Sequence, residues 1–287
     1  MTIRTTASGW CPVSLKDIVS HFPSLTIAVI GDAMTDVYHW GRLTKLSQEA
    51  PVPVFVEDRR ELRPGGAANV TANLKAWGIK VREHTFHTAV KHRYMAGHYQ
   101  VFRIDEDYPG RPDGEWIDAT VGELREGALD AIILSDYAKG TCREKVCLRM
   151  IQLASHRKIP VIVDPKGTDW TKYGGATVLC PNQQEFAPVG RMWPDFNILE
   201  KRGEEGIQIH SPLYPQGGPL VPAKARHVFD PCGAGDTVVA GVAAAVAVGA
   251  TLEQAAVIGN IAAGYVVGEV GTAVCPFDYL ERMCASS

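Results

Sequence analysis

The sequence predicts an α/β fold in which a mainly parallel sheet is covered by helices on both faces. Short apolar, β-branched runs recur along the chain; each ends in a polar turn, and most are followed by a helical segment. Strands buried on both faces of a sheet have this continuous apolar character, and parallel neighbours are joined through helices. Because parallel strands all end at the same edge of the sheet, the polar turns that follow them gather there, where ligands bind.

Composition narrows the class of protein. With 287 residues the chain can form one large α/β domain or two small ones. The net charge of −3 argues against nucleic acid or an anionic membrane as the main partner. No stretch resembles a signal peptide or a transmembrane helix, so we expect a cytoplasmic protein. Seven scattered cysteines without a Cys-x-x-Cys pair indicate reduced thiols rather than a zinc site.

The first predicted strand leads into an acidic turn. A short amphipathic helix is predicted over residues 15–22, and the apolar run Leu25–Ile30 follows as a buried strand. Asp32 and Asp36 come next, at the carboxyl end of this strand. In that place they can bind substrate hydroxyls or cap the loop, and for Asp32 the sequence leaves the two roles equally open.

Residues 37–63 lack a helical period and are predicted to form an extended flap. Within it, Pro51–Val56 is typical of an edge strand, because proline has no N–H for the ladder. Such a flap either covers a site or pairs with a second subunit. The pair Gly65-Gly66 then precedes a helix that stops at Gly78, which makes a first glycine-rich helix start.

Residues 91–105 alternate in the manner of a strand, which puts Arg103 and Asp105 on one face. Four histidines in or near this region raise the hypothesis of a metal site: His84, His87, His92 and His98. Their spacings match neither a helical i, i+4 pair nor one strand face. Solvated or loop histidines are therefore favoured over metal ligands.

The second half of the chain repeats the pattern of strand, polar turn and helix. Strands with the turns that follow are predicted at 128–134 and 135–140, 160–163 and 164–167, and 177–180 and 181–185. Helices are predicted at 115–127, at 145–157 and, including Asn260, at 252–267. A hairpin with a Gly203/Gly206 turn is predicted at 197–209.

The late segment Gly233-Ala234-Gly235-Asp236 is followed by small apolar residues as far as Gly249. This run is too short to span a bilayer and lacks strand alternation, so we predict a buried helix. The segment then lies at the helix N-terminus, where free amides and the helix dipole attract anions. Asp236 either caps the helix or faces the anion site as a base, and this motif alone favours the cap.

Motifs in this order resemble the ribokinase-like (PfkB-type) sugar kinases: Gly65-Gly66-x-x-Asn69, Asn182-x-x-Glu185 and Asp230-x-x-Gly233-Ala234-Gly235-Asp236. Longer segments are similar to the heptose 7-phosphate kinases of bacterial lipopolysaccharide synthesis. These segments are 31–36, 49–54, 63–69, 135–140 and 164–168. The resemblance covers most of residues 25–280.

The resemblance implies a ribokinase-like three-layer α/β sandwich, with residues 1–287 as one domain and 37–63 as a small β flap or lid. It implies an enzyme that uses ATP and Mg²⁺ to phosphorylate a sugar or sugar-phosphate hydroxyl. The implied acceptor is heptose 7-phosphate at its anomeric position. A homodimer formed through the flap is implied as well.

The resemblance also assigns roles around the phosphates. Asp236 would take the proton of the acceptor, and the helix N-terminus would hold the transferred phosphate. The amides of this anion hole belong to Gly233, Ala234 and Gly235. Glu185 would hold Mg²⁺ through water, with Asn182 beside it.

Nucleotide and sugar contacts follow from the same resemblance. The nucleotide site would include Lys166, Lys201, Gly203, Gly206 and Asn260. For Lys166, a surface ion pair is the alternative to neutralising phosphate charge. Sugar hydroxyls would be held by Asp36, Gly65, Gly66 and Asn69. The candidates for a distal phosphate, with solvated strand faces as the alternative, are Lys91, Arg93 and Arg103.

The chain departs from the family pattern in several places. A strand–helix–strand portion after Gly78 and a helix after Glu185 are shortened, Lys201 replaces a threonine, and Pro231-Cys232 are unusual. These departures motivate a second hypothesis, a catalytically weak relative that binds nucleotide or sugar as a regulator or assembly partner. A Rossmann-type dehydrogenase is disfavoured, because no Gly-x-Gly-x-x-Gly follows the first strand.

Overall fold

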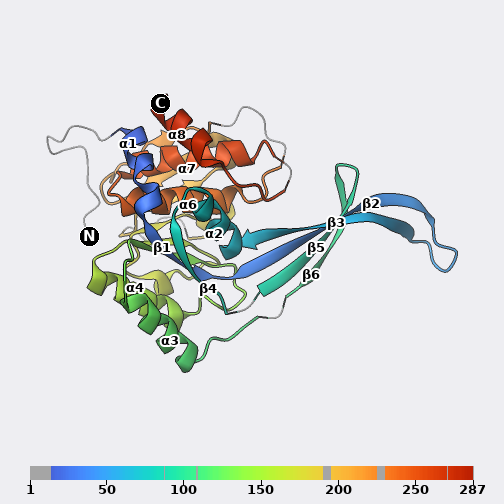
Figure 1. The fold of residues 1–287 in the computed structure, drawn as a ribbon, viewed down its shortest axis with the longest axis horizontal. Helices are drawn as coiled ribbons and strands as arrows, with labels where there is room; N and C mark the ends of the chain where they lie inside the picture. The colour runs from blue at the N-terminus through green and yellow to red at the C-terminus, as the bar shows by residue number, and fades with distance from the viewer. Residues whose placement is uncertain are drawn as a thin grey trace.

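The computed structural model describes residues 14–86, 88–107, 109–189, 195–224, 230–269 and 271–286. Within these ranges the strands form a central eight-stranded sheet and a four-stranded sheet that projects from the body of the molecule (Figure 1). The strands of the central sheet, from edge to edge, are β12 (Leu220–Val221), β11 (Ile207–His210), β10 (Ile198–Lys201), β9 (Val178–Leu179), β8 (Val161–Asp164), β7 (Ala131–Ser135), β1 (Thr26–Gly31) and β4 (Lys80–His84).

The central sheet is parallel from β4 through β10; β11 pairs antiparallel with β10, and β12 pairs antiparallel with β11. The predicted apolar strands and the predicted hairpin of β10 and β11 are confirmed. β4 is a strand that the sequence pattern did not reveal. It lies at the edge of the sheet and its side chains are mostly half-buried, so it lacks the continuous apolar character of its neighbour β1.

Helices cover both faces of the central sheet. One face carries α1 (Leu15–Ser20), α2 (Ala67–Ala76), α6 (Ala234–Ala247), α7 (Leu252–Val266) and α8 (Phe277–Ala285), and the other carries α3 (Gly114–Arg125) and α4 (Glu144–Arg157). Shorter helical pieces are α5 (Gln183–Phe186), η1 (Phe22–Ser24), η2 (Thr171–Tyr173) and η4 (Gly203–Glu205). Along β1, Ile27 and Val29 belong to the core on the side of α2, α6 and α7, and Ala28 and Ile30 belong to the core on the side of α3 and α4. Both faces of the strand are apolar for this reason.

Helix α6 lies at the centre of the larger core. All of its residues from Asp236 to Val246 are buried, as predicted for this run of small apolar residues. It packs closely on α7, where a Cβ added to Gly241 would lie 3.1 Å from the Cα atom of Gly259. None of the described helices, α6 included, is both long and apolar enough to cross a membrane.

The second sheet is the flap, and it is larger than predicted. Its strands, in order, are β3 (Pro53–Gly66), β2 (Ala33–Leu46), β5 (Thr88–Ala96) and β6 (Tyr99–Glu106). The paired hairpin of β2 and β3 extends beyond the predicted 37–63 at both ends. β5 pairs in parallel with β2, so the alternating stretch at 91–105 belongs to the flap rather than to the central sheet. β3 is an edge strand, as predicted for residues 51–56.

The histidines of this region lie apart from one another. His84 ends β4 and lies beside Glu123 of α3, whereas His92 is hydrogen-bonded to His39 in the flap at 2.9 Å. His98 lines a small cavity at the flap, and His87 lies outside the described residues. In the part of the chain that the structure describes, no three metal-binding side chains gather in one place.

Candidate active site

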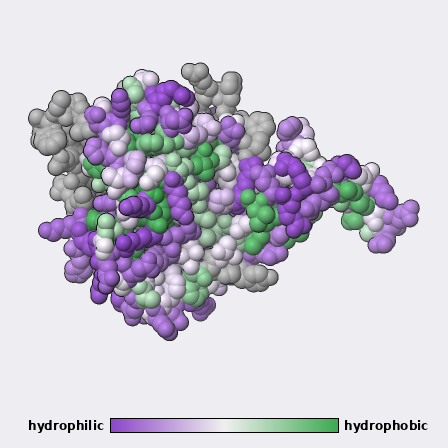
Figure 2. Space-filling model, viewed as in Figure 1, coloured by the Kyte–Doolittle hydropathy of each residue, from purple (hydrophilic) through white to green (hydrophobic). Residues whose placement is uncertain are grey.

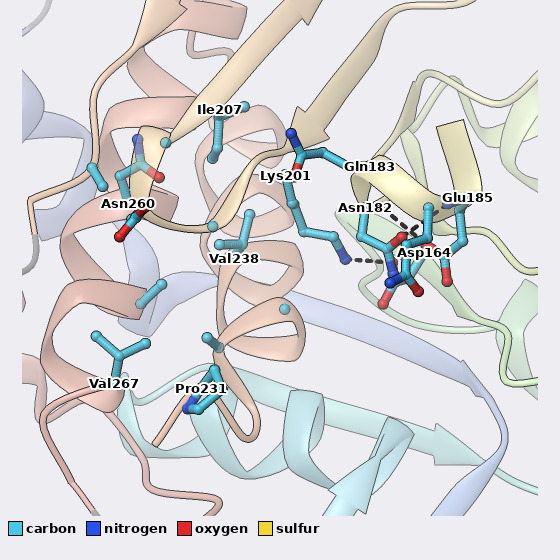
Figure 3. A pocket seen from close by; sticks show the side chains of 18 of the residues that line it. Asp164, Asn182, Gln183, Glu185, Lys201, Ile207, Pro231, Val238, Asn260 and Val267 are labelled. Atoms are coloured by element: carbon cyan, nitrogen blue, oxygen red, sulfur yellow. Dashed lines mark hydrogen bonds and ion pairs between the residues drawn. The ribbon is translucent and has the colours of Figure 1, made fainter. Parts of the chain in front are cut away.

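A cavity of about 1190 Å³ lies at the carboxyl ends of β7, β8 and β10, beside α6 and α7. Figure 3 shows Lys201 turned toward Asp164 on one wall and Asn260 on the opposite wall. The cavity gathers most of the residues predicted for the nucleotide and its phosphates: Lys166, Asn182, Glu185, Lys201, Gly203, Gly206, Ala234, Gly235 and Asn260. The carboxyl edge of the sheet is thus where the predicted site residues meet.

Asp236 lies in the first turn of α6 and is only 4% exposed. Its carboxylate does not cap the helix, since Gly233 is the N-cap residue and no side chain bonds there. One carboxylate oxygen accepts a hydrogen bond from Nδ2 of Asn69 at 2.9 Å, and the other accepts one from the hydroxyl of Tyr137 at 2.5 Å. Burial raises the pKa of Asp236, while both hydrogen bonds and the charge of Lys201 oppose that rise. The capping alternative is therefore wrong.

The two glycine-rich helix starts face each other. Gly66 is the N-cap residue of α2 with a φ of +56°, and a Cβ there would lie 2.5 Å from the carbonyl oxygen of Asp32. Gly233 has a φ of +79°, and its Cβ would lie 2.7 Å from Nδ2 of Asn69. Only glycine suits both the conformation and the space at these two positions. The starts of α2 and α6 are brought into contact in this way.

Asp32 organises the loop that follows β7. Its side chain is fully buried. One carboxylate oxygen accepts hydrogen bonds from the backbone N–H groups of Tyr137 and Lys139, both at 2.9 Å, and the other accepts one from Thr141 at 2.8 Å. Of the two roles left open by the sequence, Asp32 has the loop-capping one.

Lys201 and Asp164 form a buried ion pair in the cavity wall, with 2.6 Å between Nζ and Oδ1. Burial lowers the pKa of Lys201, but the charge and hydrogen bond of Asp164 raise it above its usual value. Burial raises the pKa of Asp164 to about 7, although Lys201 opposes the rise. We take the pair as ionised, because so short a contact stabilises both charges. Nζ of Lys201 would lie 3.3 Å from a Cβ on Gly235, which places the ammonium at the start of α6.

Glu185 and Asn182 form the capping box of the short helix α5. Oδ1 of Asn182 accepts from the backbone N–H of Glu185, and Oε2 of Glu185 accepts from that of Asn182, both at 2.9 Å. Oε1 of Glu185 bonds to Nζ of Lys166 at 2.8 Å, so the ion pair that was one alternative for Lys166 is present. These bonds hold the carboxylate of Glu185 in the cavity wall (Figure 3). Lys166 lines the same cavity.

Asn260 and Gly206 hold the opposite wall of the cavity. Nδ2 of Asn260 donates to the backbone carbonyls of Val221 and Pro222, at 2.9 and 3.1 Å. Gly206 has a φ of +109°, and a Cβ there would lie 2.1 Å from the carbonyl oxygen of Val221. Both predicted nucleotide-site residues therefore fix the chain segment around β12 against α7.

On the side of the flap, Asp36 forms a buried ion pair with Arg93 at 2.7 Å. Gly65 lies against this carboxylate, since a Cβ there would be 2.7 Å from Oδ2 of Asp36. Arg93 also lines a second cavity, of about 270 Å³, which reaches from the flap to Cys232 just before α6. The residues predicted to hold the sugar thus continue from the start of α2 onto the face of the flap that carries Asp36 and Arg93, here called its inner face.

Lys91 and Arg103, the other candidates for a distal phosphate, are placed differently. Lys91 is half-buried, and burial lowers its pKa despite the nearby charge of Asp36. Arg103 bonds to Asp105 and its side chain is 45% exposed. Neither lies among the residues described as lining the second cavity, so Arg93 alone of the three candidates reaches it.

Tyr137 is not among the site residues predicted from the sequence. It follows β7, and a polar side chain after a buried strand is the signal that was available. Its hydrogen bond to Asp236 joins residues 99 positions apart in the chain, and no local pattern indicates such a contact.

The Lys201–Asp164 pair allows a test of stability and of its pH dependence. Lys201→Met leaves a buried carboxylate without its cation, so we expect the free energy of unfolding at pH 7 to fall by about 3 kcal/mol. Without the lysine, the pKa of Asp164 lies further above its unfolded value, and the folded state binds the proton more tightly. The free energy of unfolding of the variant should therefore fall as pH rises from about 5 to about 8. Urea unfolding followed by circular dichroism measures both effects.

The control is the double variant Lys201→Met with Asp164→Asn, which removes the buried carboxylate as well. We expect it to recover part of the lost stability and to lose the added pH dependence. Equal stability of Lys201→Met and the wild-type protein across this pH range would contradict the buried pair.

Comparisons with known proteins relate the chain to carbohydrate kinases. A model of the pfkB family of carbohydrate kinases matches residues 197–278. A bifunctional protein HldE from Pseudomonas syringae is 37% identical over 314 residues, covering 93% of this chain and 65% of that protein. The HldE protein of Methylobacillus flagellatus is 38% identical over 312 residues, covering 90% and 63%. The chain therefore spans a little less than two thirds of the length of these curated relatives.

Solved structures show the same fold at low sequence identity. Phosphofructokinase-2 from Escherichia coli superposes with a TM-score of 0.70 at 15% identity, covering 91% of this chain and 98% of that one. A ribokinase of Arabidopsis thaliana, solved with ribose and ATP, superposes with a TM-score of 0.64 at 15% identity, covering 92% and 99%. The predicted ribokinase-like α/β fold is confirmed. The family match at residues 197–278, together with 37% identity to an HldE protein over 93% of this chain, shows that the chain contains a carbohydrate kinase domain of the pfkB family.

Proposed function

We propose that this chain transfers the γ-phosphoryl group of ATP to a hydroxyl of a sugar phosphate, with the anomeric hydroxyl of heptose 7-phosphate as acceptor. The observation that carries the proposal is the buried carboxylate of Asp236 where α2 meets α6. Phosphoryl transfer to an alcohol needs a base for the proton and charge stabilisation for the phosphate. The motif resemblance to heptose 7-phosphate kinases supports the choice of acceptor.

Asp236 accepts the proton of the acceptor hydroxyl as the hydroxyl oxygen attacks phosphorus. Asn69 and Tyr137 hold the carboxylate in place, so no reorientation is needed at that moment. The free amides and the dipole at the start of α6 stabilise negative charge on the transferred group. Lys201, next to Gly235, adds a positive charge at the same point.

The nucleotide would occupy the larger cavity, whose volume of about 1190 Å³ is ample for a ligand of that size. Asn182 and Glu185 present amide and carboxylate oxygens in its wall. Oxygen atoms of this kind suit Mg²⁺, which keeps several waters and is bound mainly by phosphates. The ion would supply neutralisation of phosphate charge when bound. Lys166 lies beside Glu185 and adds to that neutralisation.

The sugar would lie on the other side of Asp236, between α2 and the inner face of the flap. Asp36 offers its carboxylate to hydroxyls, and the absence of side chains at Gly65 and Gly66 lets the sugar approach the backbone. Arg93 would bind the distal phosphate from the second cavity, since a guanidinium group matches that anion.

A relative that only binds nucleotide or sugar is the less supported function. A pure binder needs no base, yet Asp236 is buried and held by two donors. The shortened segments that motivate this alternative follow Gly78 and Glu185, and the described site residues are assembled despite them.

The role of Asp236 is tested by Asp236→Asn. The amide has nearly the same shape but cannot accept the proton, so we expect sugar-dependent release of ADP to fall at least a hundredfold. The thermal unfolding midpoint should change little. Asp118→Asn, at an exposed position of α3, is the matched control and should keep full activity. Turnover by Asp236→Asn at the wild-type rate would show that the base lies elsewhere.

The distal phosphate is tested by comparing Arg93→Met with Arg103→Met. We expect Arg93→Met to raise KM for the phosphorylated sugar about tenfold or more, and to affect the unphosphorylated sugar much less, because a charged hydrogen bond to phosphate is lost. Arg103→Met, the control on the next strand, should leave both KM values near those of the wild type. An equal loss for both sugars in Arg93→Met would assign the residue to holding Asp36 rather than to phosphate.

Dimer formation through the flap is supported by the two unlike faces of this sheet. Register pairs put Asp36, Lys91 and Arg63 on one face, and Val37, Leu62 and Ile104 on the other. Leu62 is 68% exposed, and Leu43, Leu46, Phe102 and Ile104 of the flap are exposed too. Figure 2 shows such hydrophobic patches along the projection. Exposed apolar groups of this extent indicate a surface that a second copy covers.

The flap interface is tested by Leu62→Glu. A charge buried between two copies is costly, so we expect the mass in solution to change from dimer to monomer, as measured by light scattering after size-exclusion chromatography. Leu148→Glu, on the exposed side of α4, is the control and should leave the mass unchanged. A wild-type protein that is monomeric at all concentrations would contradict this interface.

A further inference from the structure

The phenol of Tyr137 is hydrogen-bonded to the carboxylate that we propose as the base. The distance from its hydroxyl oxygen to Oδ1 of Asp236 is 2.5 Å, and the other carboxylate oxygen is bonded to Asn69. We infer that Tyr137 is a positioning residue that fixes the orientation and the negative charge of Asp236 for proton abstraction. The inference rests on the proposed function, because it assigns Tyr137 a role in that reaction.

The backbone of Tyr137 is held by the buried carboxylate of Asp32. Its N–H donates to Oδ2 of Asp32 at 2.9 Å, and Asp32 also holds Lys139 and Thr141 of the same loop. Ala138, between Tyr137 and Lys139, has a φ of +57°, a left-handed conformation that is uncommon for a residue with a Cβ. Such conformations persist where the surroundings determine the backbone, and they cluster at functional sites. The loop is therefore built to present Tyr137 in one place.

The ring of Tyr137 lies near Gly66, at the start of α2. Its Cε2 atom lies 3.4 Å from the position that a Cβ of Gly66 would take. The residue also lines the larger cavity, so it lies at the boundary between the proposed nucleotide site and the base. From this position the hydroxyl reaches Asp236.

The direction of the hydrogen bond follows from the burial of both groups. Burial raises the pKa of Tyr137 far above its usual value, and the negative charges of Asp236, Asp164 and Glu185 add to the rise. The phenol consequently keeps its proton at all physiological pH values, and its O–H is the donor of the hydrogen bond to Asp236. Together with Asn69, it supplies one donor to each carboxylate oxygen, which fixes the plane of the group and leaves lone pairs for the acceptor hydroxyl.

A donor on the charged form lowers the pKa of a carboxyl group. For Asp236, Tyr137 and Asn69 act in this direction together with the charge of Lys201, whereas burial and the charge of Asp36 act against it. Removal of the phenolic O–H should therefore raise the pKa of Asp236. Less of the base is then ionised at a given pH, and the acidic limb of the pH–rate profile moves to higher pH.

The test compares Tyr137→Phe with Tyr173→Phe. Tyr173 is a control for the loss of a buried phenol, because its hydroxyl donates to the carboxylate of Asp136 at 2.7 Å and not to that of Asp236. We expect Tyr137→Phe to lower kcat at pH 7 about tenfold to a hundredfold, to shift the acidic limb of kcat/KM to higher pH, and to change KM for ATP little. Tyr173→Phe should keep the wild-type pH profile, whatever it does to stability.

A second readout does not depend on turnover. In protein labelled with ¹³C at the aspartate side-chain carboxyl, the signal of Asp236 is identified by its loss in Asp236→Asn. Its titration should move to higher pH in Tyr137→Phe and not in Tyr173→Phe. Absence of turnover by the wild-type protein would reject the proposed kinase reaction, and the titration would still report on Tyr137. An unchanged titration and an unchanged pH profile in Tyr137→Phe would overturn the inference while leaving the kinase reaction in place.

Discussion

The site depends on keeping one carboxylate charged although it is removed from water. A buried carboxylate is stable in that state only if hydrogen bonds and positive charge replace its hydration. Asp236 receives a donor from Asn69 on α2, a donor from Tyr137 after β7, and the nearby charge of Lys201 from β10. The dipole of α6 favours a negative charge in its first turn as well. Three segments far apart in the chain must pack correctly before this one group is tolerated, so the fold and the site are stabilised by the same contacts.

The flap has one polar face and one apolar face. Because side chains alternate along a strand, β2 turns Asp36 to one side and Val37 to the other. The side with Asp36 carries the ion pair to Arg93 and borders the second cavity. The other side carries exposed apolar groups such as Leu62. One sheet can then close over a polar ligand and meet a second copy without mixing the two surfaces, and a shift of register by one residue would exchange them.

Local patterns in the sequence predicted the parts of the molecule that depend on local chemistry. Composition and spacing were enough to predict the strand after residue 25, the small-residue helix α6 and the glycine pair before α2. β4 was missed because an edge strand with half-buried side chains lacks a clear period. The extent of the flap was underestimated because the pairing of β5 with β2 joins segments about 50 residues apart. Tyr137 and the Lys201–Asp164 pair were hidden for the same reason, since both are contacts between distant segments.

The shortened segments can be reconciled with an intact site by their place in the fold. The segment after α2 is reduced to β4, which lies at the edge of the central sheet, and β5 of the flap begins four positions after β4 ends. The donors around Asp236 come instead from α2, the end of β7 and the end of β10, which the loss at that edge does not touch. The second shortening follows the capping box of Asn182 and Glu185, and that box closes within four residues. The segment after α2 therefore lies where the sheet ends, apart from the groups that stabilise the charge of Asp236, and a site for phosphoryl transfer does not depend on its length.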